Sequence, residues 1–446
     1  MKPFLKNLFV LPDRLPFYYG WVVIAVAFVT MAIAVNVRTA FSLLFPPILD
    51  EFGWQRGVTA AAFSVGFVSS VALAPMFGVL MDRWGPRVVI PIGAMSATLG
   101  LIAATYAASP IGLYLTLGVM VIGASIAMSY HVHSMFLPNW FVRRRGLAIG
   151  IAFSGVGVGA IVILPWLQSL IAADGWRHAC IAFAVILFIT VVPLNLVFQR
   201  QDPSEFGLQP DGHRTNDKAE GMLGPVDVIV DHVWAERCWT LKSASRTPKF
   251  WWIASAYFTA LYAWYSVQVH QTRYLMDTGF NANVAATALG LVGVFGIFGQ
   301  ITIGALSDRI GREWGWTIAL LGYVACYGAL IVLEARPSLA LVYFIAAAQG
   351  LMGHGIGSLY GIVANEVFAG PRFATIFSVL ALGGNIGAAA GPWMTGDVFD
   401  RTGSYALAFW LSGILSVVSV LCIWIAAPRK IRLAAGVAER RAIPPN

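Results

Sequence analysis

Arg38 is the residue whose placement most needs a chemical explanation. It lies in a run, from Tyr18 to Phe45, that holds no other charged side chain. A guanidinium keeps its proton in proteins, and at the centre of a bilayer it costs about 2.5–3.5 kcal/mol on the most lenient scale. Arg38 follows Gly20 by 18 residues, or ~27 Å along a helix. This depth is compatible with a carboxylate-binding site, a structural ion pair, or snorkelling to the outer interface.

Histidines form the second group of candidates. His131, His133, His270 and His354 all lie within long apolar runs. Histidine titrates near neutrality, so a buried one that faces water could carry a proton; the alternative is a structural hydrogen-bonding role. His131 and His133 are two positions apart, roughly 200° around a helix, which is poor geometry for a shared metal ion. We expect no metal site.

Neutral polar side chains in the same runs complete the candidate substrate-binding set. Amides and phenols can bind the uncharged parts of a ligand, although aromatic packing is the alternative for each tyrosine. The expected substrate-binding residues are Arg38, Asn36, His131, His270, Gln300, Tyr265, His354 and Asn385.

The elements that must position these residues are membrane-spanning helices. The 446 residues are 58% hydrophobic and only 11% charged, with a mean hydropathy of +0.74, whereas soluble domains carry about 25% charged residues. Twelve apolar runs have the length of ~20 residues needed to cross a bilayer. They cover approximately 19–45, 59–80, 88–107, 111–137, 147–171, 180–198, 250–275, 284–306, 316–333, 339–367, 374–395 and 405–427. We therefore predict an all-α membrane protein with twelve transmembrane helices.

Basic residues indicate the orientation of these helices. The net charge is +8, and most of the basic residues fall in loops on the side that holds the N-terminus, as the positive-inside rule requires of a cytoplasmic face. This distribution explains the charge without nucleic-acid binding. We expect both termini to be cytoplasmic, and we see no cleaved signal peptide. The residues on this side are Arg83, Arg87, Arg143, Arg144, Arg145, Arg309, Arg312, Arg372, Arg429, Lys430 and Arg432.

The sequence predicts two related halves joined by a polar linker. The predicted parts are a cytoplasmic N-terminal segment 1–17, a six-helix bundle 18–200, a cytoplasmic linker 201–249, a second bundle 250–427 and a tail 428–446. Asp82 and Asp308 differ by 226 positions, and Gly123 and Gly350 differ by 227. Several matches near one offset indicate duplication, which is common in secondary transporters.

Two motifs carry a resemblance to a known family. "GVLMDRWGPR" at 78–87 and "GALSDRIGRE" at 304–313 resemble the repeated loop motif of the major facilitator superfamily. This resemblance implies two pseudo-symmetric six-helix bundles around a central cavity that opens alternately to each face. "WFVRRRGLAIGIAFSG" at 140–155 is similar to the pattern of the monocarboxylate porter and oxalate–formate antiporter branch. The opening Gly20-Trp21 keeps part of that branch's first motif but lacks its preceding acid.

The resemblance implies a switching role for the charged loop residues. Asp82 is expected to engage the start of the 374–395 helix near Arg372, and Asp308 the start of the 147–171 helix near Arg145. These contacts would hold the bundles together on the cytoplasmic side; static salt bridges are the alternative. The expected gating residues are Asp82, Arg83, Arg87, Arg145, Asp308, Arg309, Arg312, Glu366 and Arg372.

The resemblance also implies a function. We expect a proton-coupled carrier of a small organic anion, with Arg38 facing the cavity to attract the carboxylate. Gln300 stands where monocarboxylate porters usually place an arginine, and Gly296 where they place an acid. Either Arg38 acts as the main cation, with a histidine, or the substrate is not a simple monocarboxylate.

Two other functions are compatible with the same sequence. One is an exporter of amphipathic compounds, and the other is a sensor with a transporter fold that binds a ligand without moving it. An enzyme is not expected, because no loop has a nucleophile–base pair, a metal cluster or a phosphate-binding loop. We expect no cofactor, a monomer, and a location in a plasma membrane such as the bacterial inner membrane.

Overall fold

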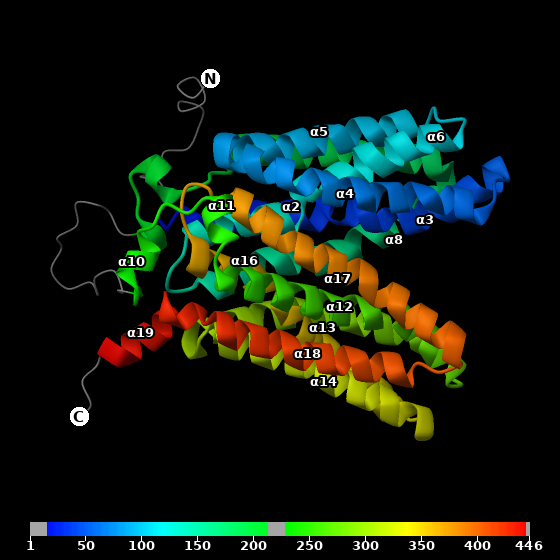
Figure 1. The fold of residues 1–446 in the computed structure, drawn as a ribbon. Coiled ribbons are helices and arrows are strands. Elements are labelled where there is room, and N and C mark those ends of the chain that lie inside the picture. The colour runs from blue at the N-terminus through cyan, green and yellow to red at the C-terminus, as the bar shows by residue number, and fades with distance from the viewer. Residues whose placement is uncertain (1–15, 213–227, 443–446) are drawn as a thin grey trace. The chain divides into compact units, whose positions relative to one another are not determined.

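The computed structural model describes residues 16–212 and 228–442. Parts of the predicted N-terminal segment 1–17, linker 201–249 and tail 428–446 therefore lie outside the described residues. The chain divides into two compact units, Met1–Phe141 with Gly155–Glu220, and Val142–Ser154 with Gly221–Asn446. The described residues are almost entirely helical, with one isolated antiparallel bridge between Ile229 and Arg432 (Figure 1).

Helices of the first unit begin with α2 and α3, which follow each other through Val35. α8 is shared, because its residues up to Ser154 belong to the second unit. The elements are α2 Gly20–Ala34, α3 Asn36–Phe52, α4 Arg56–Trp84, α5 Pro86–Ala104, α6 Pro110–Leu113, η2 Tyr114–Gly123, η3 Ala124–Met128, α7 Tyr130–Phe136, η4 Leu137–Asn139, α8 Arg145–Ile186, η5 Leu187–Val191, α9 Val192–Phe198, η6 Pro203–Phe206 and η7 Pro210–Gly212.

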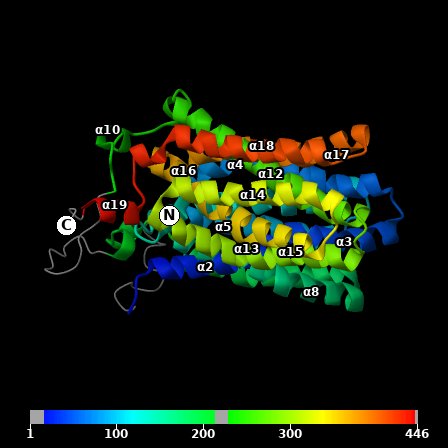
Figure 2. The same cartoon turned by 90° about the horizontal axis from the view of Figure 1, so that it is seen from below.

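The second unit contains the remaining helices, several of them long, as Figure 2 shows from below. They are α10 His232–Ala235, α11 Leu241–Ala244, α12 Pro248–Asp277, α13 Ala282–Ile310, α14 Arg312–Ala335, α15 Leu339–Ala347, η8 Ala348–Met352, η9 Gly353–Gly355, α16 Ile356–Phe368, α17 Phe373–Thr402, α18 Ala406–Ala426, η10 Pro428–Lys430 and α19 Ala435–Ala442.

Ten helical segments among the described residues are long and apolar enough to cross a membrane. One of them, 145–198, contains two of the predicted spans, because the chain turns at Gly175, where φ is 84°. α12 has 30 residues and the required length but a more polar composition, including Gln268, His270 and Arg273. The predicted all-α membrane fold is therefore confirmed, and these two cases account for the difference between ten and twelve.

Two predicted spans are not regular α-helices. The segment 110–139 changes from the π-helix η2 to the 3₁₀-helix η3 and then to α7. Ser129, which lies between η3 and α7, has an extended backbone with ψ 179°. The segment 339–368 repeats this order through η8, η9 and α16. Such interruptions are frequent at functional sites. His131 and His354 lie at them, in α7 and η9.

α12 and α17 of the second unit lie side by side because glycines allow a close approach (Figure 1). A Cβ atom built at Gly387 would lie 2.0 Å from the carbonyl oxygen of Phe258, and one at Gly391 would lie 2.4 Å from that of Tyr262. Helices in lipid associate mainly through such close packing. The glycines of α17 therefore set the distance between these two helices.

Gly387→Ala should destabilise the protein, since overpacking a filled contact costs about 1–3 kcal/mol. The matched control is Gly328→Ala in α14, where an added Cβ meets no atom within 4 Å. Thermal unfolding in detergent should show a lower midpoint for Gly387→Ala than for the control. Equal midpoints would contradict the packing role of this glycine.

Candidate functional site

Arg38 is held in the third position of α3 by uncharged groups of the first unit. Its Nη2 donates to Ser70 Oγ of α4 at 3.2 Å and to Ser125 Oγ of η3 at 3.1 Å. Its guanidinium carbon lies 4.9 Å from the centroid of the Phe67 ring, within the range of a cation–π contact. These contacts orient the guanidinium.

The two serines are themselves oriented by backbone. The hydroxyl groups of Ser70 and Ser125 donate to the carbonyl oxygen of Ile122 at 3.0 and 2.6 Å. Because each hydroxyl has one hydrogen, this bond leaves the serine oxygen as an acceptor for Arg38. The end of η2 therefore determines where the guanidinium lies.

Asn36, also predicted at the substrate site, makes structural contacts in the first unit. Its Nδ2 donates to the carbonyl oxygens of Ala32 at 2.8 Å and Val156 at 3.2 Å. The side chain is buried, and these bonds join α3 to α8. A role for Asn36 in binding substrate stays a prediction.

His131 and His133 are buried in the short helix α7. Ser129 caps this helix, since its hydroxyl oxygen accepts from the backbone N–H of His131 at 3.3 Å. His133 Nδ1 lies 3.0 Å from the carbonyl oxygen of Ser129. The break at Ser129 thus sets where α7 begins, and its carbonyl oxygen contacts the imidazole of His133.

In the second unit, the predicted residue His354 packs against α13, and the predicted residue Gln300 is part of α13. The Nδ1 atom of His354 is 2.4 Å from the place of a Cβ at Gly296, so the imidazole fills the space that a larger residue would need. Gln300 is one turn further along α13 and is buried. The imidazole stacks on Trp264, with 4.6 Å between the ring centroids.

Trp264 was not among the predicted residues. It is half-buried on α12, beside Tyr265, with the ring centroids 6.3 Å apart. It is one of 16 tryptophans in the chain, and no spacing distinguishes it from the others. His270, by contrast, lies 2.9 Å through Nε2 from the carbonyl oxygen of Pro392, a contact that joins α12 to α17. Asn385 is half-buried on α17.

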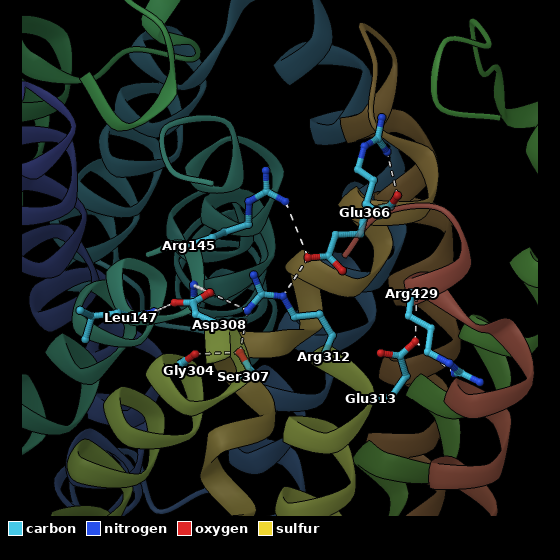
Figure 3. Close-up of polar contacts among 11 residues, drawn as sticks. Arg145, Leu147, Gly304, Ser307, Asp308, Arg312, Glu313, Glu366 and Arg429 are labelled. Carbon is cyan, nitrogen blue, oxygen red and sulfur yellow. Dashed lines mark hydrogen bonds and ion pairs between the residues drawn. The ribbon is translucent and has the colours of Figure 1, made fainter. Parts of the chain in front are cut away.

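A buried charge network joins α13, α14, α16 and the start of α8 (Figure 3). The guanidinium of Arg312 donates from Nη1 to Asp308 Oδ1 at 2.7 Å and from Nε to Glu366 Oε1 at 2.8 Å. The three residues are only 2%, 6% and 1% exposed. Ser307 Oγ also accepts from Nη1, at 2.7 Å. We call these four residues the Arg312 network.

The Arg312 network contacts the start of α8 through backbone and side chain. Asp308 accepts hydrogen bonds from the backbone N–H groups of Gly146 at 2.9 Å and Leu147 at 3.0 Å. These are among the unpaired donors of a helix N-terminus, where a carboxylate is favoured. Arg145 instead lies 3.8 Å through Nη1 from Glu366 Oε1. Asp308 therefore engages the helix backbone, and Glu366 engages Arg145.

Glycines permit this contact. A Cβ at Gly146 would lie 2.1 Å from the carbonyl oxygen of Gly304, and one at Gly304 would lie 2.2 Å from that of Gly146. The first turn of α8 can approach α13 this closely only because neither residue has a side chain.

The remaining predicted gating residues lie at helix ends. Asp82 is half-buried in the last turn of α4, just before Gly85, where φ is 72°. The Nε of Arg87 donates to the carbonyl oxygen of Leu196. Exposed side chains in this set are Arg83, Arg309 and Arg372. The predicted engagement of Asp82 with the start of α17 stays a prediction.

One ion pair and one hydrogen bond link residues of the tail to Glu313 and Glu366. Glu313 accepts from the backbone N–H of Arg429 at 2.9 Å and from its guanidinium at 3.3 Å (Figure 3). Arg432 donates from Nη1 to the carbonyl oxygen of Glu366 at 2.7 Å. Burial lowers the pKa of the Arg432 guanidinium, and the nearby Glu366 carboxylate opposes that shift. The sequence motif did not reveal this involvement of the tail.

An apolar groove of about 290 Å³ lies along α2 and α9 of the first unit. Its lining includes Phe17, Trp21, Leu194 and Phe198. Such a lining suits hydrocarbon and offers an anion no counter-charge. The groove is therefore a poor candidate for the site of a charged solute.

Sequence comparisons agree with the motifs. The family model of the Major Facilitator Superfamily matches residues 24–356 and 274–444. Monocarboxylate transporter 12 of Rattus norvegicus is 26% identical over 415 residues, which cover 90% of this chain and 84% of that protein. Monocarboxylate transporter 11 of Homo sapiens is 26% identical over 433 residues, which cover 93% and 84%. The exporter and sensor alternatives receive no support from these relatives.

Solved structures show the same fold at low identity. The fucose:proton symporter of E. coli has a TM-score of 0.66 and 16% identity, covering 91% of this chain and 98% of that chain. A proton:xylose symporter has a TM-score of 0.66 and 12% identity, covering 94% and 97%. A bacterial homologue of the iron transporter ferroportin has a TM-score of 0.67 and 14% identity, covering 91% and 99%. These neighbours, like the sequence relatives, are transporters and not enzymes.

Arg312→Ala should destabilise the protein strongly. Removing one partner of a buried ion pair costs about 3–5 kcal/mol, because the remaining charges lose their compensation. The matched control is Arg401→Ala, which removes an exposed pair with Asp397 at 3.0 Å and should cost about 0–1 kcal/mol. Thermal unfolding followed by far-UV circular dichroism measures both, and equal midpoint shifts would contradict the structural role of the Arg312 network.

Proposed function

Because the chain belongs to the major facilitator superfamily, as a multi-pass membrane transporter related to the monocarboxylate branch, we propose that it carries a small organic anion together with protons by alternating access. The observation that carries this proposal is the environment of Arg38. Ser70, Ser125 and Phe67 fix the direction of this guanidinium within a segment whose other residues carry no charge.

A carboxylate is the ligand that best complements such a guanidinium. The planar fork of arginine matches the two oxygens of a carboxylate, and a hydrogen bond to a charged group is worth about 1.5–3 kcal/mol. Gln300 occupies the position where monocarboxylate porters usually have arginine. We therefore assign the charge recognition to Arg38 and the uncharged part of the substrate to Gln300, His354 and Tyr265, with Asn385 and His270 as further candidates.

Coupling to protons follows from the cost of moving an anion. A substrate that moves with a proton transfers no net charge through the low-dielectric core, where an unpaired ion is expensive. His131 is the candidate proton carrier, because it is a buried imidazole beside the irregular segment that also contains Ser125. Substrate and proton need only change the relative stability of the two states by a few kcal/mol.

The Arg312 network is the proposed gate. In the second unit, Asp308 and Glu366 hold the first turn of α8. The other proposed gating residues are exposed or half-buried, and they are Asp82, Arg83, Arg87, Arg309 and Arg372. α8 continues beyond Ser154 into the first unit. Release of its first turn would therefore be one step of the switch between states.

Orientation and assembly are part of the same proposal. The distribution of basic residues supports a cytoplasmic position for both termini and for the linker 201–249. Bundles 18–200 and 250–427 would then be the moving bodies of a monomer in a plasma membrane, such as the inner membrane of a bacterium. These boundaries follow the composition of the chain.

Arg38→Ala should reduce uptake at least about tenfold, in line with loss of a charge-assisted hydrogen bond. The measurement is initial uptake of radiolabelled lactate, pyruvate and acetate into proteoliposomes under an inward proton gradient. Arg38→Lys should recover only part of the rate, because lysine keeps the charge but loses the planar fork.

The control for this experiment is Arg401→Ala, which removes an exposed arginine. A protonophore should abolish accumulation if protons drive it, and His131→Gln should weaken the response to the gradient. Uptake that is unchanged in Arg38→Ala, with the variant correctly folded, would contradict the organic-anion assignment.

Asp308→Asn and Asp82→Asn should each lower the transport rate, and Asp82→Asn, at a half-buried helix end, should leave the protein folded and inserted. Because Asp308 pairs with the buried Arg312, transport by Asp308→Asn is measured per folded, inserted molecule. An amide retains the size of the side chain but loses the charge that stabilises a helix N-terminus. Asp397→Asn, which changes an exposed acid, is the matched control. If both motif variants transport at the rate of the control, the two acids are not part of a gate.

A further inference from the structure

We propose that the C-terminal segment 428–442, paired with the linker residues Val228–Asp231, is a strap that restrains the gate, and that loosening it accelerates transport. The proposal rests on the proposed transport function. Its physical basis is a set of contacts in the second unit that join the tail to the end of α13, the end of α16 and the residues before α8.

The strap is anchored first by a short antiparallel pairing. The backbone N–H of Val230 donates to the carbonyl of Ile431 at 2.9 Å, and the N–H of Leu433 donates to the carbonyl of Val228 at 2.8 Å. Between them, Arg432 donates to the carbonyl of Glu366 at 2.7 Å. The pairing is therefore fastened to the same residue whose carboxylate binds Arg312.

The second anchor is the docking of α19 on the end of α13. Ala434, Ala435 and Ala438 are buried, and a Cβ at Gly436 would lie 3.0 Å from both Arg309 Cα and the carbonyl oxygen of Asp308. Arg440 donates to the carbonyl oxygen of Arg309, one of the carbonyls that a helix end leaves unpaired. Small side chains thus bring α19 directly onto the acidic motif.

The third contact reaches the residues that precede α8. Arg143 Nε lies 3.5 Å from Glu439 Oε1, and the two side chains are 29% and 47% exposed. α19 therefore contacts the end of α13 at Arg309 and the residues before α8 at Arg143. Asp308 connects the same two segments, because it lies in α13 and accepts from the N–H of Gly146. A strap with these attachments stabilises one arrangement of the gate.

The nature of the contacts suits a restraint that can be released. An exposed ion pair contributes little and is screened by salt, and α19 is only eight residues long, too short to be stable alone. Its helical form therefore depends on docking. Because the strap binds one arrangement of α13 and α8, its contacts shift the equilibrium toward that state.

Gly436→Ala tests the docking, because the substitution should make α19 more ordered if the helix is undocked and less ordered if it is docked. Alanine favours a helix over glycine, so an undocked α19 would become more ordered. In the docked helix the new Cβ presses on the backbone of Arg309. Overpacking of this kind should shift the equilibrium between docked and undocked α19 toward the undocked form by roughly 5- to 100-fold. Amide hydrogen exchange of the peptide 429–442 in the full-length protein should become at least about fivefold faster.

The transport readout uses the same variant in proteoliposomes. We expect initial uptake of labelled lactate or pyruvate to rise roughly two- to fivefold, in proportion to the released fraction. Gly413→Ala is the control, since its Cβ would meet only Tyr327 at 3.9 Å. Glu439→Arg should also loosen the tail, and the charge-swapped pair Arg143→Glu with Glu439→Arg should restore slow exchange.

The outcomes separate this proposal from the transport assignment. Faster exchange with faster uptake supports the strap. Unchanged exchange in Gly436→Ala, or faster exchange with uptake equal to that of the control, overturns it. Absence of uptake by the wild-type protein, with exchange still faster in the variant, overturns the transport proposal and leaves only the docking of α19.

Discussion

The cost of burying ionised side chains governs how the second unit is organised. Arg312, Asp308 and Glu366 are almost fully buried, and each would be strongly unfavourable if left without a partner. Their mutual ion pairs fix α13, α14 and α16 at one end of the unit. The N–H groups of Gly146 and Leu147 then add the first turn of α8 to the same cluster. A contact of this kind holds firmly only while all its members are present, which is a useful property for a gate.

The same constraint is met differently at Arg38. Here two hydroxyls and an aromatic face contact the guanidinium, and these contacts orient the cation. Arg312 is a cation paired with the protein's own acids, whereas Arg38 is the cation to which we assign the substrate anion. The two arginines also differ in burial, since Arg312 is 2% exposed and Arg38 is half-buried.

Much of the fold could be predicted from the sequence, because apolar length and repeated loop motifs are local properties. The helical membrane architecture followed from composition, and the acidic motif pointed to Asp308. The pairing of Arg312 with Glu366 could not be predicted, since it joins residues 54 positions apart through packing of α14 on α16. The breaks at Ser129 and Gly353 lie in apolar runs that resemble ordinary spans. Trp264 was missed because nothing local separates a stacking tryptophan from one that faces lipid.

The division of α8 has a consequence for how the protein could be cut and reassembled. Residues Val142–Ser154 belong to the second unit although they precede the linker in the chain. A fragment that starts after the linker would lack the two N–H donors of Asp308 and the Arg145 guanidinium beside Glu366. Two co-expressed pieces could complement each other, because the N-terminal piece carries the residues Val142–Ser154 that the second unit needs.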